Sequence, residues 1–170
     1  MIRGRAKDVG DVIAAAEELV GRTRLQKTLA LLEMAGLGYG FRFDYHKFGP
    51  YSEDLVVSVD RAIALGYATE EERRANWGGR YSIFRAPHHS TGDARRDSLI
   101  EIAKKADAIA LELAVTAAFL AQCEHAPSPW DEVARRKPEK ADVKTITNAK
   151  KLYKQFRSVP NLPLELPAIV

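Results

Sequence analysis

The segment from Arg95 to Glu124 places the strongest constraint on how this chain can fold. Leucine, isoleucine and alanine recur along it at helical spacing, and further apolar residues widen the stripe onto other sides of the same helix. A helix that is apolar on more than one side has to be covered on more than one side. The spacing therefore predicts one long helix over residues 95–124 at the centre of a helical unit.

Length and composition are those of an ordinary globular chain. The 170 residues are 46% hydrophobic and 29% charged, and they include one cysteine. A chain of this length buries about 70% of its surface on folding, so it needs neither a metal nor a disulfide to form a core. One cysteine cannot form an internal disulfide, the N-terminal segment lacks an apolar leader core, and the apolar stretch 108–121 is too short to cross a membrane. These features predict a cytoplasmic protein without membrane association.

The first half of the chain predicts a helix, a helix, a strand, a helix and a β-hairpin in that order. Capping residues and helical spacing predict the helices, and alternation of aromatic or apolar residues with polar ones predicts the strands. The order is typical of a winged helix-turn-helix domain in which the hairpin is the wing. The predicted fold class is mainly α with a small β-hairpin, and residues 1–86 are the winged-helix-like unit. The expected helices are 8–20, 23–36 and 52–66, and the expected strands are 39–48, 67–69 and 80–85.

The second half predicts a helical unit over residues 95–157, packed on the first unit after a polar, turn-rich boundary at 86–93. A short helix near 130–136 and a final helix over 141–156 are expected to cover the 95–124 helix, with Val143 and Phe156 turned inward. Residues 158–170 contain three prolines, which predicts an extended tail. The tail is expected either to dock on its own core or to lie along another chain.

Two motifs resemble those of known prokaryotic proteins. Residues 25–27 read Leu-Gln-Lys early in a helix, and residues 47–52 read Lys-Phe-Gly-Pro-Tyr-Ser at a strand-to-helix junction. In these motifs the chain resembles the YwgA-like group and, more distantly, the Panacea domain of SocA-type antitoxins. The YwgA-like resemblance extends over most of residues 10–156. It implies a non-enzymatic protein of winged-helix type, and the likeness to Panacea implies a protein that neutralises a toxin by binding it.

The formal net charge of +3 is unevenly distributed, because residues 1–94 have no net charge and residues 135–157 carry +7. The helix expected to read DNA has a net negative exposed set (Glu53, Asp54, Ser58, Asp60 and Arg61), which argues against major-groove recognition. A nucleic acid or other anion is therefore expected at basic residues outside that helix, although the basic final helix is also explained as a solvated face. The candidates are Arg22, Arg24, Lys27, Arg73, Arg74, Arg80, Arg85, Lys150, Lys151 and Lys154.

The junction at residues 47–52 has a structural explanation and a functional one. Gly49 permits a tight turn, Pro50 ends the strand, and Ser52 caps the following helix. The alternative is that the junction contacts a partner. A tryptophan in the hydrophilic loop of the wing is a second candidate for such a contact. The candidate partner contacts are Lys47, Tyr51, Ser52 and Trp77.

The sequence carries no recognisable catalytic motif. It lacks a phosphate-binding glycine loop, a nucleophile elbow and a zinc-protease motif, and its histidines do not have the spacing of metal ligands. Cys123 is interpreted as a small packed hydrophobe. No catalytic residue, metal or cofactor is predicted. The expected function is a regulator-like or antitoxin-like binding module whose partner is a protein, such as a toxin, or DNA, with homodimerisation as a further option. The alternatives are an accessory subunit of a defence or enzyme complex and a small enzyme.

Overall fold

The computed structural model describes residues 2–170, with side chains from Arg5 onward, so Met1 of the predicted unit 1–86 lies outside the described residues. The fold is mainly α with a small antiparallel sheet, as predicted. The elements in chain order are α1 (Ile2–Ala16), β1 (Glu18–Val20), α2 (Arg22–Met34), β2 (Asp44–His46), β3 (Gly49–Tyr51), α3 (Glu53–Ala64), β4 (Thr69–Arg74), β5 (Arg80–Arg85), α4 (Ala94–Lys105), α5 (Ala108–Cys123), α6 (Pro129–Arg136) and α7 (Val143–Arg157).

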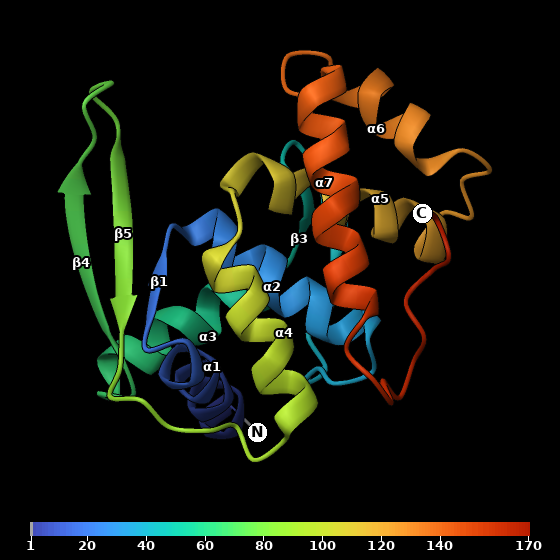
Figure 1. Cartoon of the computed structure of the whole chain (residues 1–170). Coiled ribbons are helices and arrows are strands. Elements are labelled where there is room, and N and C mark those ends of the chain that lie inside the picture. Colours follow the sequence, from blue (N-terminus) through green and yellow to red (C-terminus); the bar gives the residue numbers. More distant parts are fainter. Residues whose placement is uncertain (1) are drawn as a thin grey trace.

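Five short strands form two separate antiparallel sheets. The larger sheet has the order β1-β5-β4, with Leu19 opposite Phe84 and Glu72 opposite Ser82. The smaller sheet is the β2–β3 hairpin, which ends directly before α3. Figure 1 shows that the turn end of the β4–β5 hairpin extends away from the helical body, whereas Ser82, Ile83 and Phe84 of β5 are buried.

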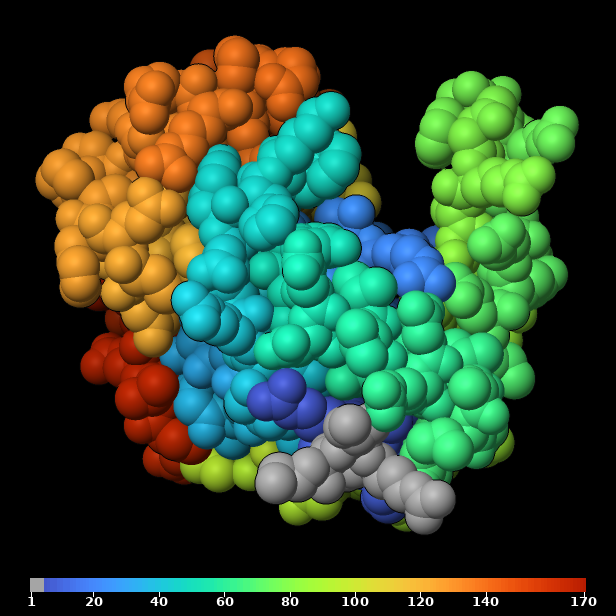
Figure 2. All heavy atoms as spheres, turned by 180° about the vertical axis from the view of Figure 1, so that it is seen from behind, coloured from blue at the N-terminus to red at the C-terminus, as the bar shows by residue number. Residues whose placement is uncertain are grey.

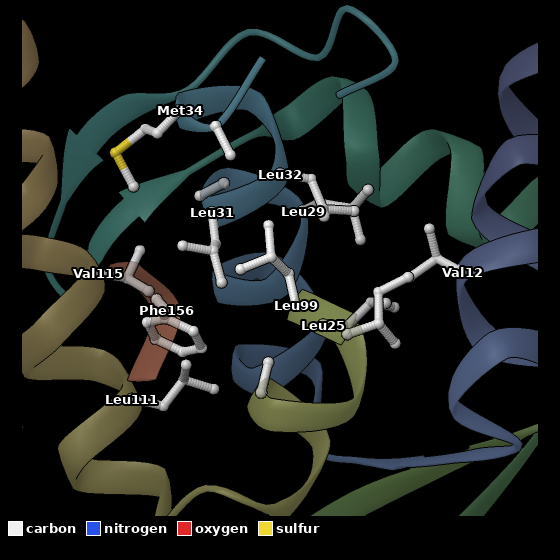
Figure 3. Close-up of a cluster of buried hydrophobic side chains, with 14 of the residues drawn as sticks. Val12, Leu25, Leu29, Leu31, Leu32, Met34, Leu99, Leu111, Val115 and Phe156 are labelled. Carbon is white, nitrogen blue, oxygen red and sulfur yellow. The ribbon is translucent and has the colours of Figure 1, made fainter. Parts of the chain in front are cut away.

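One hydrophobic core runs through both predicted units, and α2 lies in its middle. Leucines of α2 face Val12 of α1, Leu99 of α4 and Leu111 of α5 in Figure 3. Phe156 of α7 completes the same cluster. Because residues from the first and last helices share this core, the two halves of the chain stabilise each other.

The long helix predicted over 95–124 is in fact two helices. The chain is extended at Ala106 (ψ 149°), and Asp107 caps α5 by accepting a hydrogen bond from the amide of Ala110 at 3.0 Å. Arg24 stabilises the break, because its guanidinium donates to the carbonyls of Ala103 and Ala106 at 2.8 and 2.6 Å. All residues from 110 to 120 are buried, so the expectation that this segment is covered on several sides is confirmed.

Two other predictions in the first half are wrong. The helix predicted over 8–20 ends at Ala16, because Glu17 has a positive φ of 66° and the next three residues pair with β5. The strand predicted over 39–48 forms only at Asp44–His46. The three amides of residues 39–41 each donate to one oxygen of Glu33 at 2.8 Å, which holds that segment in an irregular conformation.

The side-chain predictions contain further errors. Val143 is 86% exposed rather than inward, whereas Phe156 is buried as predicted. Ser58 is buried rather than exposed on α3. Cys123 is exposed and is not a packed core residue. Val143 is the first residue of α7 and Cys123 the last residue of α5, where a helix end projects beyond its packing partners, whereas Ser58 lies on the buried face of α3 with Leu55, Val59 and Ala62.

The C-terminal tail docks on its own chain. Tyr153 donates its hydroxyl to the carbonyl of Pro167 at 2.6 Å, and the indole N–H of Trp130 donates to the carbonyl of Ile169 at 2.8 Å. The amide of Leu164 donates to Ala35, next to the C-terminal end of α2, and Leu166 is 1% exposed. Of the two options left open for the tail, the structure therefore shows docking in cis.

Candidate interaction site

A hollow lies between the β2–β3 hairpin and the β4–β5 hairpin, with the first turns of α2 at its floor. We call it the inter-hairpin hollow. It has two compartments, of about 470 and 280 Å³, which share the lining residues Arg22, Thr23 and Lys27. Figure 2 shows the hollow as a deep gap between residues 40–60 and the β4–β5 hairpin.

The smaller compartment is apolar. Its walls are Leu25 of α2 and Leu55, Val56 and Val59 of α3, and Tyr51 of β3 closes one end. Phe48 lies at the rim and is 49% exposed, an unusual position for a large apolar side chain next to a core. The compartment therefore presents apolar surface to solvent beside a rigid pair of helices.

Most of the charged residues that line the larger compartment are basic. Arg22, Arg24, Lys27 and Arg80 line it together with a single acidic residue, Glu72. Trp77 lines part of this compartment and is 78% exposed. A side chain at Gly79 would overlap the ring of Trp77, so the glycine allows the indole to lie against the hairpin backbone.

The two sequence motifs meet at the floor of the hollow. The side-chain amide of Gln26 pairs with the backbone of Ser52 in both directions: its Nε2 donates to the Ser52 carbonyl and its Oε1 accepts from the Ser52 amide, each at 2.9 Å. Lys27 donates to the carbonyl of Pro50 at 2.7 Å. The Ser52 hydroxyl accepts from the amide of Leu55 at 3.2 Å and caps α3, as predicted. These contacts hold α2, β3 and α3 in a fixed relation and so shape the apolar compartment.

The turn at Gly49 is tightly packed against α5. Gly49 has a φ of 88°, and a Cβ there would overlap Oγ1 of Thr116. Within residues 5–170, this Thr116 hydroxyl is one of two buried side-chain polar groups without a hydrogen-bond partner. The glycine of the junction motif is therefore required both by its backbone conformation and by the close approach of α5.

A cluster of charged side chains lies beneath the same junction. Glu112 of α5 is 4% exposed and forms ion pairs with Lys137 at 3.1 Å and Lys140 at 2.9 Å. Lys137 also donates to the carbonyl of Lys47 at 3.2 Å, which ties the C-terminal half to the junction. Burial lowers the pKa of Lys27 to about 7; Glu112 partly opposes this shift, and the charges of Lys137 and Lys140 reinforce it.

The structure separates the predicted basic contacts of α2 into two kinds. Arg22 is about half-exposed and pairs with Glu70 at 2.8 Å, so its guanidinium lies at the edge of the hollow. Arg24 and Lys27 bind backbone carbonyls of the chain itself, and Lys27 is 1% exposed. Their principal contacts are therefore structural.

The wing arginines lie among glutamates that sequence reasoning did not pair with them. Arg73 pairs with Glu71, and Arg85 pairs with both Glu71 and Glu18. Arg80 lies 3.6 Å from Glu72, a longer and more exposed pair, and Arg74 is exposed directly across the hairpin from Arg80. The wing is therefore close to neutral and has no strongly basic face.

The basic residues of α7 lie apart from the wing. Lys150, Lys151 and Lys154 are exposed on α7, which packs on the opposite side of the body from the β4–β5 hairpin in Figure 1. Lys150 lies over the ring of Trp130, and Lys151 lines a separate groove against α4 and α5. The structure does not bring the two predicted basic regions together.

The candidate partner residues are distributed differently from one another. Tyr51 and Trp77 line the hollow, and Lys47 is exposed beside Phe48. Ser52 is 1% exposed, and its polar atoms are used in the helix cap and in the pairing with Gln26. From the sequence, Phe48 is assigned to the core in preference to a base-stacking contact, and Val56 is assigned to the apolar side of its helix, because such residues beside a helix start are usually part of the core.

Two negative findings concern the described part of the chain. Its histidine, cysteine, aspartate and glutamate side chains form no group of three that could hold a metal ion. No helix within residues 2–170 has both the length and the apolar character needed to cross a membrane.

Comparison with known proteins finds one informative similarity. The chain is 29% identical over 97 residues to the uncharacterised protein YwgA of Bacillus subtilis (strain 168). The matched region covers 57% of this chain and 56% of that protein, so the chain spans about half of its relative's length. This weakly supports the YwgA-like part of the resemblance. No family model and no solved structure matches the chain.

Proposed function

We propose that this chain is a non-enzymatic binding protein of winged-helix type that holds a protein partner in the inter-hairpin hollow. The winged-helix assignment is supported by the order α1, β1, α2, α3, β4 and β5, and by the pairing of the short β1 with the last strand of the hairpin. In this assignment the β4–β5 hairpin is the wing, and α3 is the helix that enters the major groove in DNA-binding members.

The apolar compartment carries the proposal. It is open to solvent, it is walled by side chains from two helices, and a half-exposed Phe48 lies at its rim. Exposed apolar surface of this kind is characteristic of interaction sites, because filling it removes apolar area from water. Trp77 lines the larger compartment of the same hollow, and exposed aromatic residues often anchor protein interfaces.

The charge distribution supports a protein partner over duplex DNA. The first turn of α3 is acidic at Glu53 and Asp54, and Asp60 is exposed further along the helix. Phosphates approaching the wing would have to compete with the glutamates that already pair with Arg73 and Arg85. A DNA-binding surface needs uncompensated positive charge at these positions.

Site-specific photo-crosslinking in the producing cells tests this function. A photoreactive phenylalanine analogue replaces Phe48 in one variant and Trp77 in another. Leu164 is the control position, because it is 50% exposed and lies beside Ala35 at the C-terminal end of α2, roughly 12 Å along that helix from Lys27, the last residue of α2 that lines the hollow. The expected result is one discrete protein adduct that both hollow positions form and that the control position does not.

The outcomes distinguish the alternatives. An adduct at twice the mass of the chain would identify a second copy as the partner. Adducts that nuclease treatment removes, or a failure of both hollow positions to form any adduct, would refute a protein partner in the hollow. A duplex titration complements this: retardation that weakens steeply with salt and with Arg74→Glu would favour DNA instead.

A toxin is the class of partner that the likeness to Panacea suggests. If the crosslinked partner is a toxin, expressing it alone should arrest growth, and co-expressing this chain should restore growth. A partner that is harmless when expressed alone would remove the antitoxin role while leaving the binding function in place.

A further inference from the structure

We infer that the segment bound in the inter-hairpin hollow is an acidic stretch of polypeptide with one bulky apolar side chain. The apolar side chain fills the smaller compartment, and neighbouring carboxylates face Arg22 and Arg80 in the larger one. This inference rests on the proposed function and adds the chemistry of the partner to it.

The side chains of the hollow carry an excess of positive charge. Four basic residues line the larger compartment, against Glu72 as the one acidic lining residue within the described chain. Even with Lys27 partly neutral near pH 7, because burial lowers its pKa, the net charge of this lining stays positive. A concave surface with charge of one sign concentrates its field inside, so it favours an anionic segment.

Two of these arginines remain accessible to a ligand. Arg80 is 71% exposed at its side chain, and its distance of 3.6 Å to Glu72 exceeds that of a charge-assisted hydrogen bond. Arg22 is 47% exposed at its side chain and lines both compartments, but it already pairs with Glu70 at 2.8 Å and lies 3.8 Å from Asp60, so a ligand carboxylate there would share its guanidinium with these groups. A carboxylate between these two guanidinium groups would be adjacent to the entrance of the apolar compartment.

The smaller compartment limits the size of the apolar group. Its volume of about 280 Å³ equals that of about nine water molecules at ~30 Å³ each, which is room for one large side chain. Buried Leu25, Leu55 and Val59 form its walls, and the pairing of Gln26 with Ser52 holds those walls in place. The compartment is therefore preformed, which lowers the entropic cost of binding.

The two compartments are close enough for one segment to occupy both. They meet at Arg22, Thr23 and Lys27, on consecutive turns of the same helix. Trp77 lines the larger compartment and Phe48 the smaller one, and the two residues belong to separate hairpins. An extended chain passing between the hairpins would contact the basic lining and insert a side chain beside Phe48.

Selection of phage-displayed random dodecapeptides on the immobilised full chain tests the inference. The expected enriched peptides contain several aspartates or glutamates around a leucine, methionine, phenylalanine or tryptophan. The most enriched sequence is then synthesised with a fluorescein label, and its affinity is measured by fluorescence anisotropy against the wild-type chain and four variants.

Two variants alter the hollow and two are matched controls. Arg80→Glu reverses a charge in the hollow, and Arg73→Glu makes the same change on the same hairpin outside it. Thr23→Trp places bulk where the compartments meet, and Thr69→Trp places it at the exposed start of β4. We expect at least a tenfold loss of affinity for each hollow variant and less than a threefold change for each control, with far-ultraviolet circular dichroism confirming that all four fold.

Several results would overturn the inference. These are enrichment of basic or purely apolar peptides, enrichment of no peptide, or equal effects of Arg80→Glu and Arg73→Glu. Tighter binding of a fluorescein-labelled single-stranded oligonucleotide, with the same loss in Arg80→Glu, would assign the basic lining to nucleic acid. If the Phe48 crosslink persists while the peptide result fails, the proposed protein partner stands and only its acidic chemistry is wrong.

Discussion

Replacing Gln26 with methionine tests whether the pairing of the two motifs holds the hollow together. Gln26 is 6% exposed, and both of its side-chain hydrogen bonds go to the backbone of Ser52, which is itself buried. Methionine has a similar length and cannot form either bond. The Gln26→Met variant would therefore leave the buried amide of Ser52 without a partner, whereas the Ser52 carbonyl would keep a 3.4 Å hydrogen bond from the amide of Val56.

The expected loss follows mainly from the Ser52 amide. An unsatisfied buried backbone group costs about 1–3 kcal/mol, and the carbonyl loses one of its two hydrogen bonds, which adds about 1 kcal/mol. The gain from replacing a polar amide with an apolar thioether offsets part of this, and we expect a net destabilisation of about 1–3 kcal/mol. A domain of ordinary stability, at about 5–15 kcal/mol, would remain folded but clearly weakened.

Urea unfolding followed by far-ultraviolet circular dichroism measures the change, and Gln122→Met is the matched control. The Oε1 of Gln122 is buried without a partner, and its Nε2 reaches the carbonyl of Met34 only at 3.5 Å. The control should stay within about 1 kcal/mol of the wild type. If both methionine variants unfold at the same urea concentration, the Gln26–Ser52 pairing does not stabilise the fold as argued.

Three further predictions concern the junction, its buried lysine and the tail. Gly49→Ala should lower the free energy of unfolding by about 2–4 kcal/mol, because the new Cβ is strained at a positive φ and overlaps Thr116. In a Thr116→Ala background the loss should shrink to about 1–2 kcal/mol. Equal losses in both backgrounds would show that the overlap does not contribute. The pKa of Lys27 is 10.5 in the unfolded state and about 7 in the folded state, so the unfolded state binds more protons between these two pH values. The free energy of unfolding should therefore rise by about 2 kcal/mol from pH 7 to pH 9. Lys27→Met should remove this rise, and a Lys27→Met variant with the wild-type pH profile would contradict the assignment to Lys27. Leu166→Ala should lower the melting temperature clearly, with a loss of about 2–4 kcal/mol in the free energy of unfolding, whereas Leu164→Ala should have little effect because that side chain is 50% exposed. Similar melting temperatures for the two variants would show that the tail does not dock.

Local signals in the sequence predicted the parts of the fold that depend on local chemistry. Ser52 caps α3, as its residue type indicated, and a short helix forms at Pro129–Arg136, close to the range expected. Of the two wing strands, β5 forms at Arg80–Arg85 as predicted, but β4 spans Thr69–Arg74, so the strand predicted over 67–69 overlaps it only at Thr69. Caps and hairpins depend on residues a few positions apart, so their signals survive in the sequence.

The errors arise where a distant contact overrides the local pattern. Helical spacing continues unbroken through Ala106, yet the chain bends there and Arg24, far away in the sequence, binds the freed carbonyls. The aromatic alternation after Gly38 is suited to a strand, but Glu33 binds three consecutive amides that a strand partner would otherwise need. A pattern that covers a short stretch of sequence does not include the contacts of Arg24 and Glu33 with these segments.

The candidate site, like the fold, was predicted from the sequence only in part. The sequence drew attention to Tyr51 and Trp77 and to the basic residues of the wing, and the structure places several of these around one hollow. It could not predict that Arg73 and Arg85 have glutamate partners, because cross-strand register sets those pairs. Nor could it predict the apolar compartment, whose walls come from two helices separated by a hairpin.

By itself, the sequence determined the mainly helical character of the chain, the uneven distribution of its charge, and the presence of two motifs about twenty residues apart. Only the tertiary structure placed Gln26 and Lys27 against Ser52 and Pro50, where hydrogen bonds connect the two motifs. The physical reason is that composition and periodicity record how each segment faces water. Which buried polar groups satisfy one another is settled only when packing brings distant segments into hydrogen-bond distance.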